Sequence, residues 1–127
     1  MEYEVTLNGE VWTVSYVPSI RGSWGMCYHE PRVIEIAEGV TDRPDHRDVA
    51  IHELLHGWLG YHIDESFVLM AASRVDYALS TRRKGVRAVK VVSGTLEDYL
   101  PFVSKDCLKP MARDIVAALS TLGVPYL

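Results

Sequence analysis

The chain has 127 residues, of which 48% are hydrophobic and 24% are charged, and its formal net charge is −4. This length suits one domain with one hydrophobic core, and the composition excludes wholesale disorder. The acidic balance disfavours a dedicated nucleic-acid-binding module, which normally carries a basic excess. No apolar run approaches the roughly 18 residues that a membrane-spanning helix needs, so we expect no membrane partner.

The start of the chain and its cysteines suggest a compartment. Residues 1–4 include two glutamates and no apolar segment follows them, so they lack the features of a secretory signal. Cys27 and Cys107 are far apart in the sequence and form no CxxC zinc pair. We therefore expect a reduced protein of the cytoplasm.

The first third of the chain has the pattern of a small antiparallel sheet. Residues 3–7 and 11–17 alternate between polar and apolar side chains, and Asn8-Gly9 between them is a strong hairpin signal. Residues 18–31 contain two prolines and two glycines and predict a loop. Residues 33–36 predict a third strand, which could offer its edge to an extended peptide.

Two helices are predicted next. Apolar side chains recur at helical spacing over residues 45–59, and Gly60 is a plausible stop. Residues 65–83 are apolar on most sides, which is typical of a buried helix, and Asp64 can cap its start. We expect this second helix to pack antiparallel to the first.

The last third predicts a further strand and a further helix. Residues 86–92 have the pattern of a strand, and residues 93–106 are ambiguous. Residues 109–122 predict the final helix, with Pro110 in its first turn. The sum is an α+β fold, in which a small sheet packs against three helices within one domain over residues 1–127.

Residues 52–56 have the sequence His-Glu-Leu-Leu-His, an HExxH motif on the first predicted helix. Histidines four residues apart on a helix differ by about 40° in direction, so both imidazoles can reach one zinc ion. Glu53 lies about 100° from His52 around the helix axis, where it flanks the metal without ligating it. There it can hold a zinc-bound water and take its proton as the general base.

A zinc site that hydrolyses its substrate normally has three protein ligands and one open position. The third ligand must come from beyond the helix, and His62, Asp64 and Glu65 lie close in the sequence. Asp64 is better placed as a helix cap, whereas Glu65 in the first turn of the next helix can point back at the site. His62 lies in the connecting loop and is the alternative to Glu65.

These residues resemble those of a known group of proteins. The stretch from residue 49 to 57 and the stretch from 64 to 68 look like minimal zincin metallopeptidases, small and often phage-encoded proteins related in pattern to the SprT-like and ImmA/IrrE groups. In such gluzincin-like proteins the acidic residue that opens the second helix is the third ligand, which implies Glu65 here. The resemblance covers residues 1–83 and leaves residues 84–127 as an extension of unknown role.

His62 also stands at the spacing of the third histidine in metzincins, whose pattern is HExxHxxGxxH. Leu59 occupies the position of the glycine in that pattern, and no Met-turn follows, so Glu65 is preferred. The expected function is a zinc-dependent metallopeptidase with His52, His56 and Glu65 as ligands, Glu53 as base and a peptide or protein as substrate. The alternative is a catalytically silent zinc-binding scaffold that acts as a binding or regulatory protein.

The remaining charged residues give weaker signals. Five basic residues cluster near the end of the second predicted helix: Arg82, Arg83, Lys84, Arg87 and Lys90. Cations beside a helix C-terminus and on a solvated strand account for them, and the alternative is a patch for nucleic acid or an acidic protein partner. His29 and His46 are expected at the surface.

Overall fold

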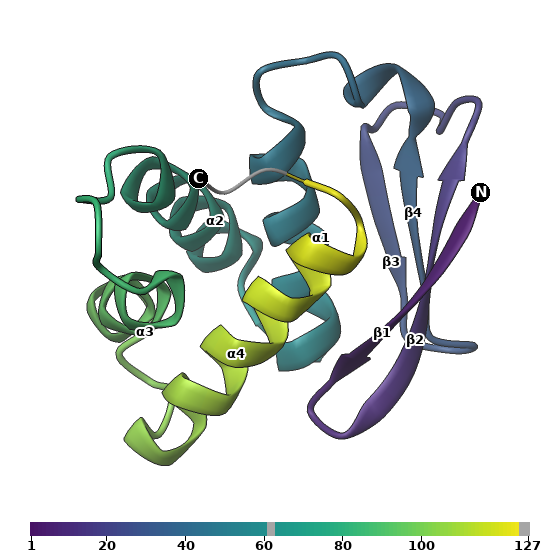
Figure 1. The fold of residues 1–127 in the computed structure, drawn as a ribbon. Coiled ribbons are helices and arrows are strands. Elements are labelled where there is room, and N and C mark those ends of the chain that lie inside the picture. Colours follow the sequence, from purple (N-terminus) through teal and green to yellow (C-terminus); the bar gives the residue numbers. More distant parts are fainter. Residues whose placement is uncertain (61–62, 125–127) are drawn as a thin grey trace.

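The computed structural model describes residues 1–60 and 63–124, and within them the chain forms four strands followed by four helices (Figure 1). The strands are β1 (Glu2–Leu7), β2 (Glu10–Val17), β3 (Gly25–Tyr28) and β4 (Val33–Ala37), and a 3-10 turn η1 (Glu38–Val40) follows them. The helices are α1 (His46–Leu59), α2 (Glu65–Ser80), α3 (Ala88–Tyr99) and α4 (Lys105–Thr121). The predicted α+β class is confirmed.

The sheet has the strand order β1-β2-β4-β3 and is mixed, so the prediction of a purely antiparallel sheet was wrong. β1 and β2 form the predicted hairpin, in which Asn8 and Gly9 both have positive φ angles, as a two-residue turn of this kind requires. β4 runs parallel to β2 and pairs with β3 on its other side. The chain enters β3 before β4, and this crossover produces the parallel pair.

One face of the sheet carries the core. Because side chains alternate across a strand, one set of apolar residues faces the helices and the polar set faces away. Figure 1 shows the helices on one side of the sheet only. The buried residues of the three longer strands are Val5, Leu7, Trp12, Val14, Ile34, Ile36 and, at the end of β4, Ala37.

The helices form two layers over that face. α1 and α4 pack directly on the sheet, α2 packs on α1, and α3 packs on α2 and α4 (Figure 1). Gly57 lets α1 approach the sheet closely, because a Cβ atom there would lie 2.8 Å from Cδ1 of Leu7. This close packing fixes the position of α1, which carries the HExxH motif and which we call the metal-motif helix, relative to the strands.

The prediction of a strand over residues 86–92 was wrong, because this segment begins α3. The valines suggest a strand, but the buried side chains Ala88, Val92 and Leu96 recur every fourth residue and form one helix face. That face extends past residue 92 into the ambiguous segment, so residues 86–92 alone do not show the helical repeat. The described chain therefore has four helices where three were expected.

The final helix starts earlier than predicted. The Ser104 side chain caps it by accepting a hydrogen bond from the backbone N–H of Asp106. Pro110 consequently lies inside α4 and not in its first turn. No helix among the described residues is both long enough and apolar enough to cross a membrane.

Asp114 on α4 ties three elements together at one point. Its Oδ2 atom accepts a hydrogen bond from the backbone N–H of Asn8 at 2.9 Å and one from Nε1 of Trp58 at 2.9 Å. Asn8 lies in the β1–β2 turn and Trp58 lies near the end of α1. One carboxylate thus joins the hairpin, the metal-motif helix and the last helix.

Replacing Asp114 by alanine should destabilise the fold, because it leaves the half-buried Trp58 indole N–H without its charged acceptor. We expect the free energy of unfolding to fall by about 1–3 kcal/mol. Denaturant unfolding followed by circular dichroism measures the change. Asp98→Ala, at an exposed position on α3, is the matched control. An equal fall in the free energy of unfolding in both variants would contradict a stabilising role for the Asp114 hydrogen bonds.

Candidate metal centre

The first turn of α2 and the middle of α1 bring three candidate ligands to one point. Nε2 of His52 lies 2.6 Å from one carboxylate oxygen of Glu65, and Nε2 of His56 lies 2.7 Å from the other. One ligand atom from each residue falls within a span of 4.8 Å. The structure thus brings together His52, His56 and Glu65, a group that could hold a metal ion.

The local sequence explains why Glu65 reaches this point. The Asp64 side chain accepts hydrogen bonds from the backbone N–H and the hydroxyl of Ser66, which starts α2 at Glu65 as predicted. Asp64 therefore acts as a helix cap and is not one of the converging ligands. The alternative ligand, His62, lies outside the described residues.

Glu53 is the one charged side chain that is buried among the described residues, with 7% of its surface exposed. It lies against β3, where a Cβ atom on Gly25 would be 2.8 Å from Cγ of Glu53 and 2.9 Å from its Oε2. Burial, with a smaller contribution from the negative charge of Glu65, raises the pKa of Glu53 to about 7. The carboxyl group is therefore positioned beside the histidines and able to exchange a proton near neutral pH.

His29 supports the metal-motif helix from the turn between β3 and β4. Its Nε2 atom donates a hydrogen bond to the carbonyl oxygen of His56 at 2.9 Å, and its ring lies edge-on to the Trp12 indole. His29 is half-buried and lines the hollow beside these residues, so it lies partly at the surface and also contacts α1. His46 is also half-buried, and its Nε2 atom lies 2.8 Å from the Tyr16 hydroxyl, so it too is only partly exposed.

The three donors could hold a metal ion, and their chemistry differs from that of an all-oxygen magnesium or calcium site. Two imidazole nitrogens and one carboxylate are typical zinc ligands, whereas magnesium and calcium prefer oxygen ligands throughout. Burial lowers the pKa of His56, although Glu65 opposes the shift, and this favours the neutral imidazole that a metal requires. A zinc ion takes ligands at about 2.0–2.2 Å, so the three side chains would shift slightly to surround one.

A hollow of about 330 Å³ is lined by His52, Glu53, His56 and Glu65, and we call it the metal hollow. Gly25, Cys27 and His29 line its sheet side. Burial, together with the charge of Glu53, raises the pKa of the Cys27 thiol to about 12. The thiol therefore stays protonated at neutral pH and is a poor ligand or nucleophile.

The sheet edge beside this hollow belongs to β3 and not to β4. Residues 33–36 were expected to offer an edge to a peptide, but β4 pairs with β2 on one side and β3 on the other. That expectation was wrong because β3 was assigned to the loop 18–31. β3 has only four residues and begins with glycine, so it leaves a weak sequence signal.

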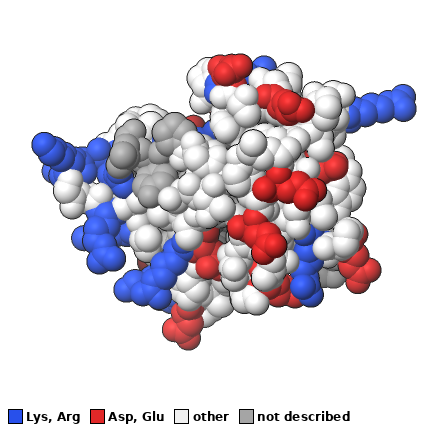
Figure 2. Space-filling model, turned by 45° about the vertical axis from the view of Figure 1, so that its right-hand side comes forward, with Lys and Arg blue, Asp and Glu red and all other residues white. Residues whose placement is uncertain are grey.

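The basic cluster lies away from the metal centre. Arg82–Lys90 spans the connection between α2 and the start of α3, where Figure 2 shows blue side chains gathered on the left of the molecule. Glu65 begins α2 and the cluster follows its end, and sixteen helical residues separate them by about 24 Å. The cluster is therefore not part of the metal hollow.

No family model, no curated protein and no solved structure matches this chain. Its function is therefore inferred from the side chains that α1, α2 and β3 bring together.

Glu65→Ala should weaken metal binding strongly, because it removes the only carboxylate that faces both imidazoles in the described residues. The loss of affinity should exceed the ~10–100-fold that removing an outer-shell partner costs. His62→Ala should leave the affinity largely unchanged. Competition with a chromophoric zinc chelator measures both variants, and the reverse ranking would identify a three-histidine site.

Proposed function

We propose that the protein is a zinc-dependent metallopeptidase. The observation that carries the proposal is the convergence of His52, His56 and Glu65 beside a buried carboxylate, Glu53. Structural zinc sites fill all four positions with protein ligands, whereas sites with three ligands leave one position for a reactant. A metal-holding group with a buried acid next to it is the arrangement that hydrolysis needs.

The chain supplies both the metal ligands and the proton carrier. Zinc, when bound, would polarise the peptide carbonyl and lower the pKa of a water ligand to about 7. The Glu53 carboxylate takes the proton of the attacking water and later gives it to the nitrogen of the leaving amine. Gly25 has no side chain, and this leaves room for the Glu53 carboxylate between α1 and β3.

The edge of β3 is suited to hold the peptide. β3 contacts α1, and its Gly25, Met26 and Cys27 line the metal hollow. An extended peptide that adds to this edge would lie over the ligands with its backbone hydrogen-bonded to the strand. The resemblance to gluzincin-like peptidases implies the same roles for the same residues and supports the proposal.

The purified protein should hold about one zinc ion per chain when zinc is supplied. Chelation should abolish hydrolysis of a peptide library, and added zinc should restore it. Elemental analysis and a fluorogenic library measure the two quantities. Metal content near zero in zinc-supplied protein would contradict both the peptidase and the silent zinc-binding alternative.

Glu53→Gln should keep the fold and the zinc but slow hydrolysis by about 10²–10⁴-fold, because the amide has nearly the same shape and cannot accept the proton. Glu97→Gln, at an exposed position on α3, is the control and should cleave at the parent rate. If Glu53→Gln cleaves as fast as the parent, Glu53 is not the base. Zinc binding without any cleavage by the parent would favour the silent scaffold.

A further inference from the structure

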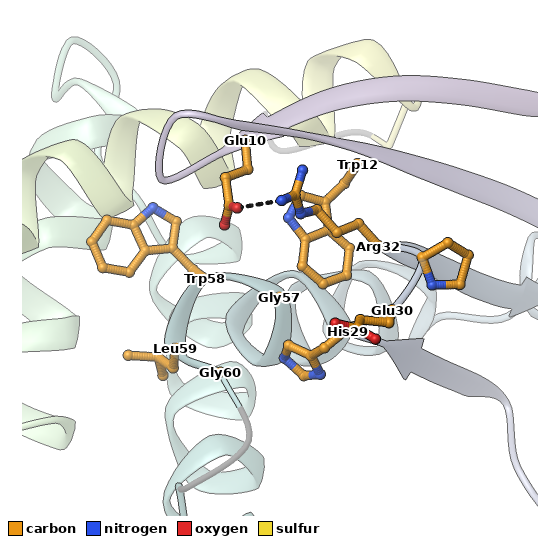
Figure 3. Close-up of a pocket in the computed structure, with 10 residues that line it drawn as sticks. Glu10, Trp12, His29, Glu30, Arg32, Gly57, Trp58, Leu59 and Gly60 are labelled. Atoms are coloured by element: carbon orange, nitrogen blue, oxygen red, sulfur yellow. Dashed lines mark ion pairs between the residues drawn. The ribbon is translucent and has the colours of Figure 1, made fainter.

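A second hollow, of about 430 Å³, lies at the C-terminal end of α1 (Figure 3). We call it the Trp12 hollow. β2 and the β3–β4 turn form one wall, and the last residues of α1 form the other. Its main lining residues are Glu10, Trp12, His29, Arg32, Trp58 and Gly60.

Trp12, which lines the hollow, carries a buried hydrogen-bond donor without a partner. Trp12 has 2% of its surface exposed, and its Nε1 is the one buried side-chain nitrogen or oxygen without a partner in the described chain. A buried N–H without an acceptor costs about 1–3 kcal/mol. A site that keeps such a donor is suited to a ligand that brings an acceptor with it.

A weak ion pair lies beside this donor. Arg32 and Glu10 are 2.8 Å apart, and each side chain is about half exposed. In Figure 3 the pair lies between the indoles of Trp12 and Trp58. Exposed ion pairs contribute about 0–1 kcal/mol, so a ligand can displace this pair at little cost and reach the indole.

The charges around the hollow select the chemistry of the ligand. Glu10 and Glu30 line it with a single cation, Arg32, so an added carboxylate would meet net negative charge. The end of α1 adds to this, because the last carbonyl groups of a helix carry partial negative charge. A peptide amide is neutral and suits this hollow. Its oxygen can accept a hydrogen bond from the Trp12 indole N–H, and its own N–H can donate one to a carboxylate.

The Trp12 hollow adjoins the metal hollow. His29 and Gly60 line both hollows, which therefore meet near the C-terminal end of α1. A peptide that lies along β3 over the metal ligands and continues past His29 would therefore enter the Trp12 hollow. Such a peptide must extend beyond the residues that flank the reacting bond.

We propose that the Trp12 hollow is a subsite for an extended peptide substrate, in which the Trp12 indole N–H donates a hydrogen bond to an amide oxygen of the peptide. This inference rests on the proposed peptidase function and adds a preference for long peptides over short ones. The amide belongs either to the peptide backbone or to a glutamine or asparagine side chain.

A direct test follows the indole N–H of Trp12 in ¹⁵N-labelled Glu53→Gln protein without metal. N-methylacetamide stands for the backbone amide and acetamide for the side-chain amide, while acetate serves as the anionic control. Each amide should shift the Trp12 resonance downfield in a saturable manner, and acetate should shift it less. The Trp24 resonance is the internal control, and an unresponsive Trp12 resonance would contradict the subsite.

A kinetic test uses Trp12→Phe, which keeps an aromatic ring and removes the N–H. With capped octapeptides of alanine, KM should rise by about 3–10-fold and kcat should stay unchanged, since one neutral hydrogen bond is lost. Capped tripeptides should show no such effect. Tyr77→Phe, at an exposed position on α2 away from both hollows, should match the parent with both lengths.

A glutamine scan through the octapeptide separates the two amide sources. A gain in affinity at one position that Trp12→Phe abolishes would identify a side-chain amide, whereas equal binding at every position would identify the backbone. Normal cleavage with no Trp12 effect in either test would overturn the subsite and leave the peptidase standing. Trp12-dependent binding without cleavage by the parent would overturn the peptidase alone. If Trp12→Phe does not fold, the resonance titration of the unmutated indole decides.

Discussion

The burial of the Glu53 carboxylate against β3 is the constraint on which the arrangement of the sheet and helices depends. Moving a carboxylate out of water is costly, and the chain does so at one charged position among the described residues. Two glycines make it possible: Gly25 leaves space for the carboxylate, and Gly57 lets α1 settle onto the sheet beside Leu7. Neither role requires a left-handed backbone, so the glycines are needed for close approach and not for turns. Burying Glu53 costs folding free energy, so we attribute its retention to the proton transfer that we propose for it.

Local signals in the sequence predicted much of the fold. The Asn8-Gly9 turn, the helix of the HExxH motif and the Asp64 cap each depend on residues within one turn of one another, and the structure confirms all three. The predictions were wrong where contacts between residues far apart in the sequence determine the secondary structure. β3 exists because it pairs with β4 and covers Glu53, and neither contact is visible in four residues that begin with glycine. α3 has valines that favour a strand, and its buried face appears only over three helical turns.

The same distinction applies to the metal centre. His52, Glu53 and His56 follow from helix geometry alone, and Glu65 follows once the Asp64 cap is recognised; all four line the same hollow. Gly25 and His29 could not be predicted, because each acts through a contact with α1 from more than twenty residues away. A glycine in a predicted loop and a histidine near a proline carry no periodic signal. Their roles depend on the crossover that places β3 at the sheet edge next to α1.

The C-terminal end of α1 connects the two hollows physically. His29 donates a hydrogen bond to the carbonyl oxygen of His56, and Asp114 accepts one from the Trp58 indole. The segment between them is therefore fixed at both ends by groups from different elements, the β3–β4 turn and α4. Because α1 is anchored in this way, a peptide that displaced the Arg32–Glu10 pair would not deform the helix. Its binding energy would instead position the peptide over the candidate ligands. In this small fold, α1 carries the candidate ligands His52 and His56 and lines both the metal hollow and the proposed subsite.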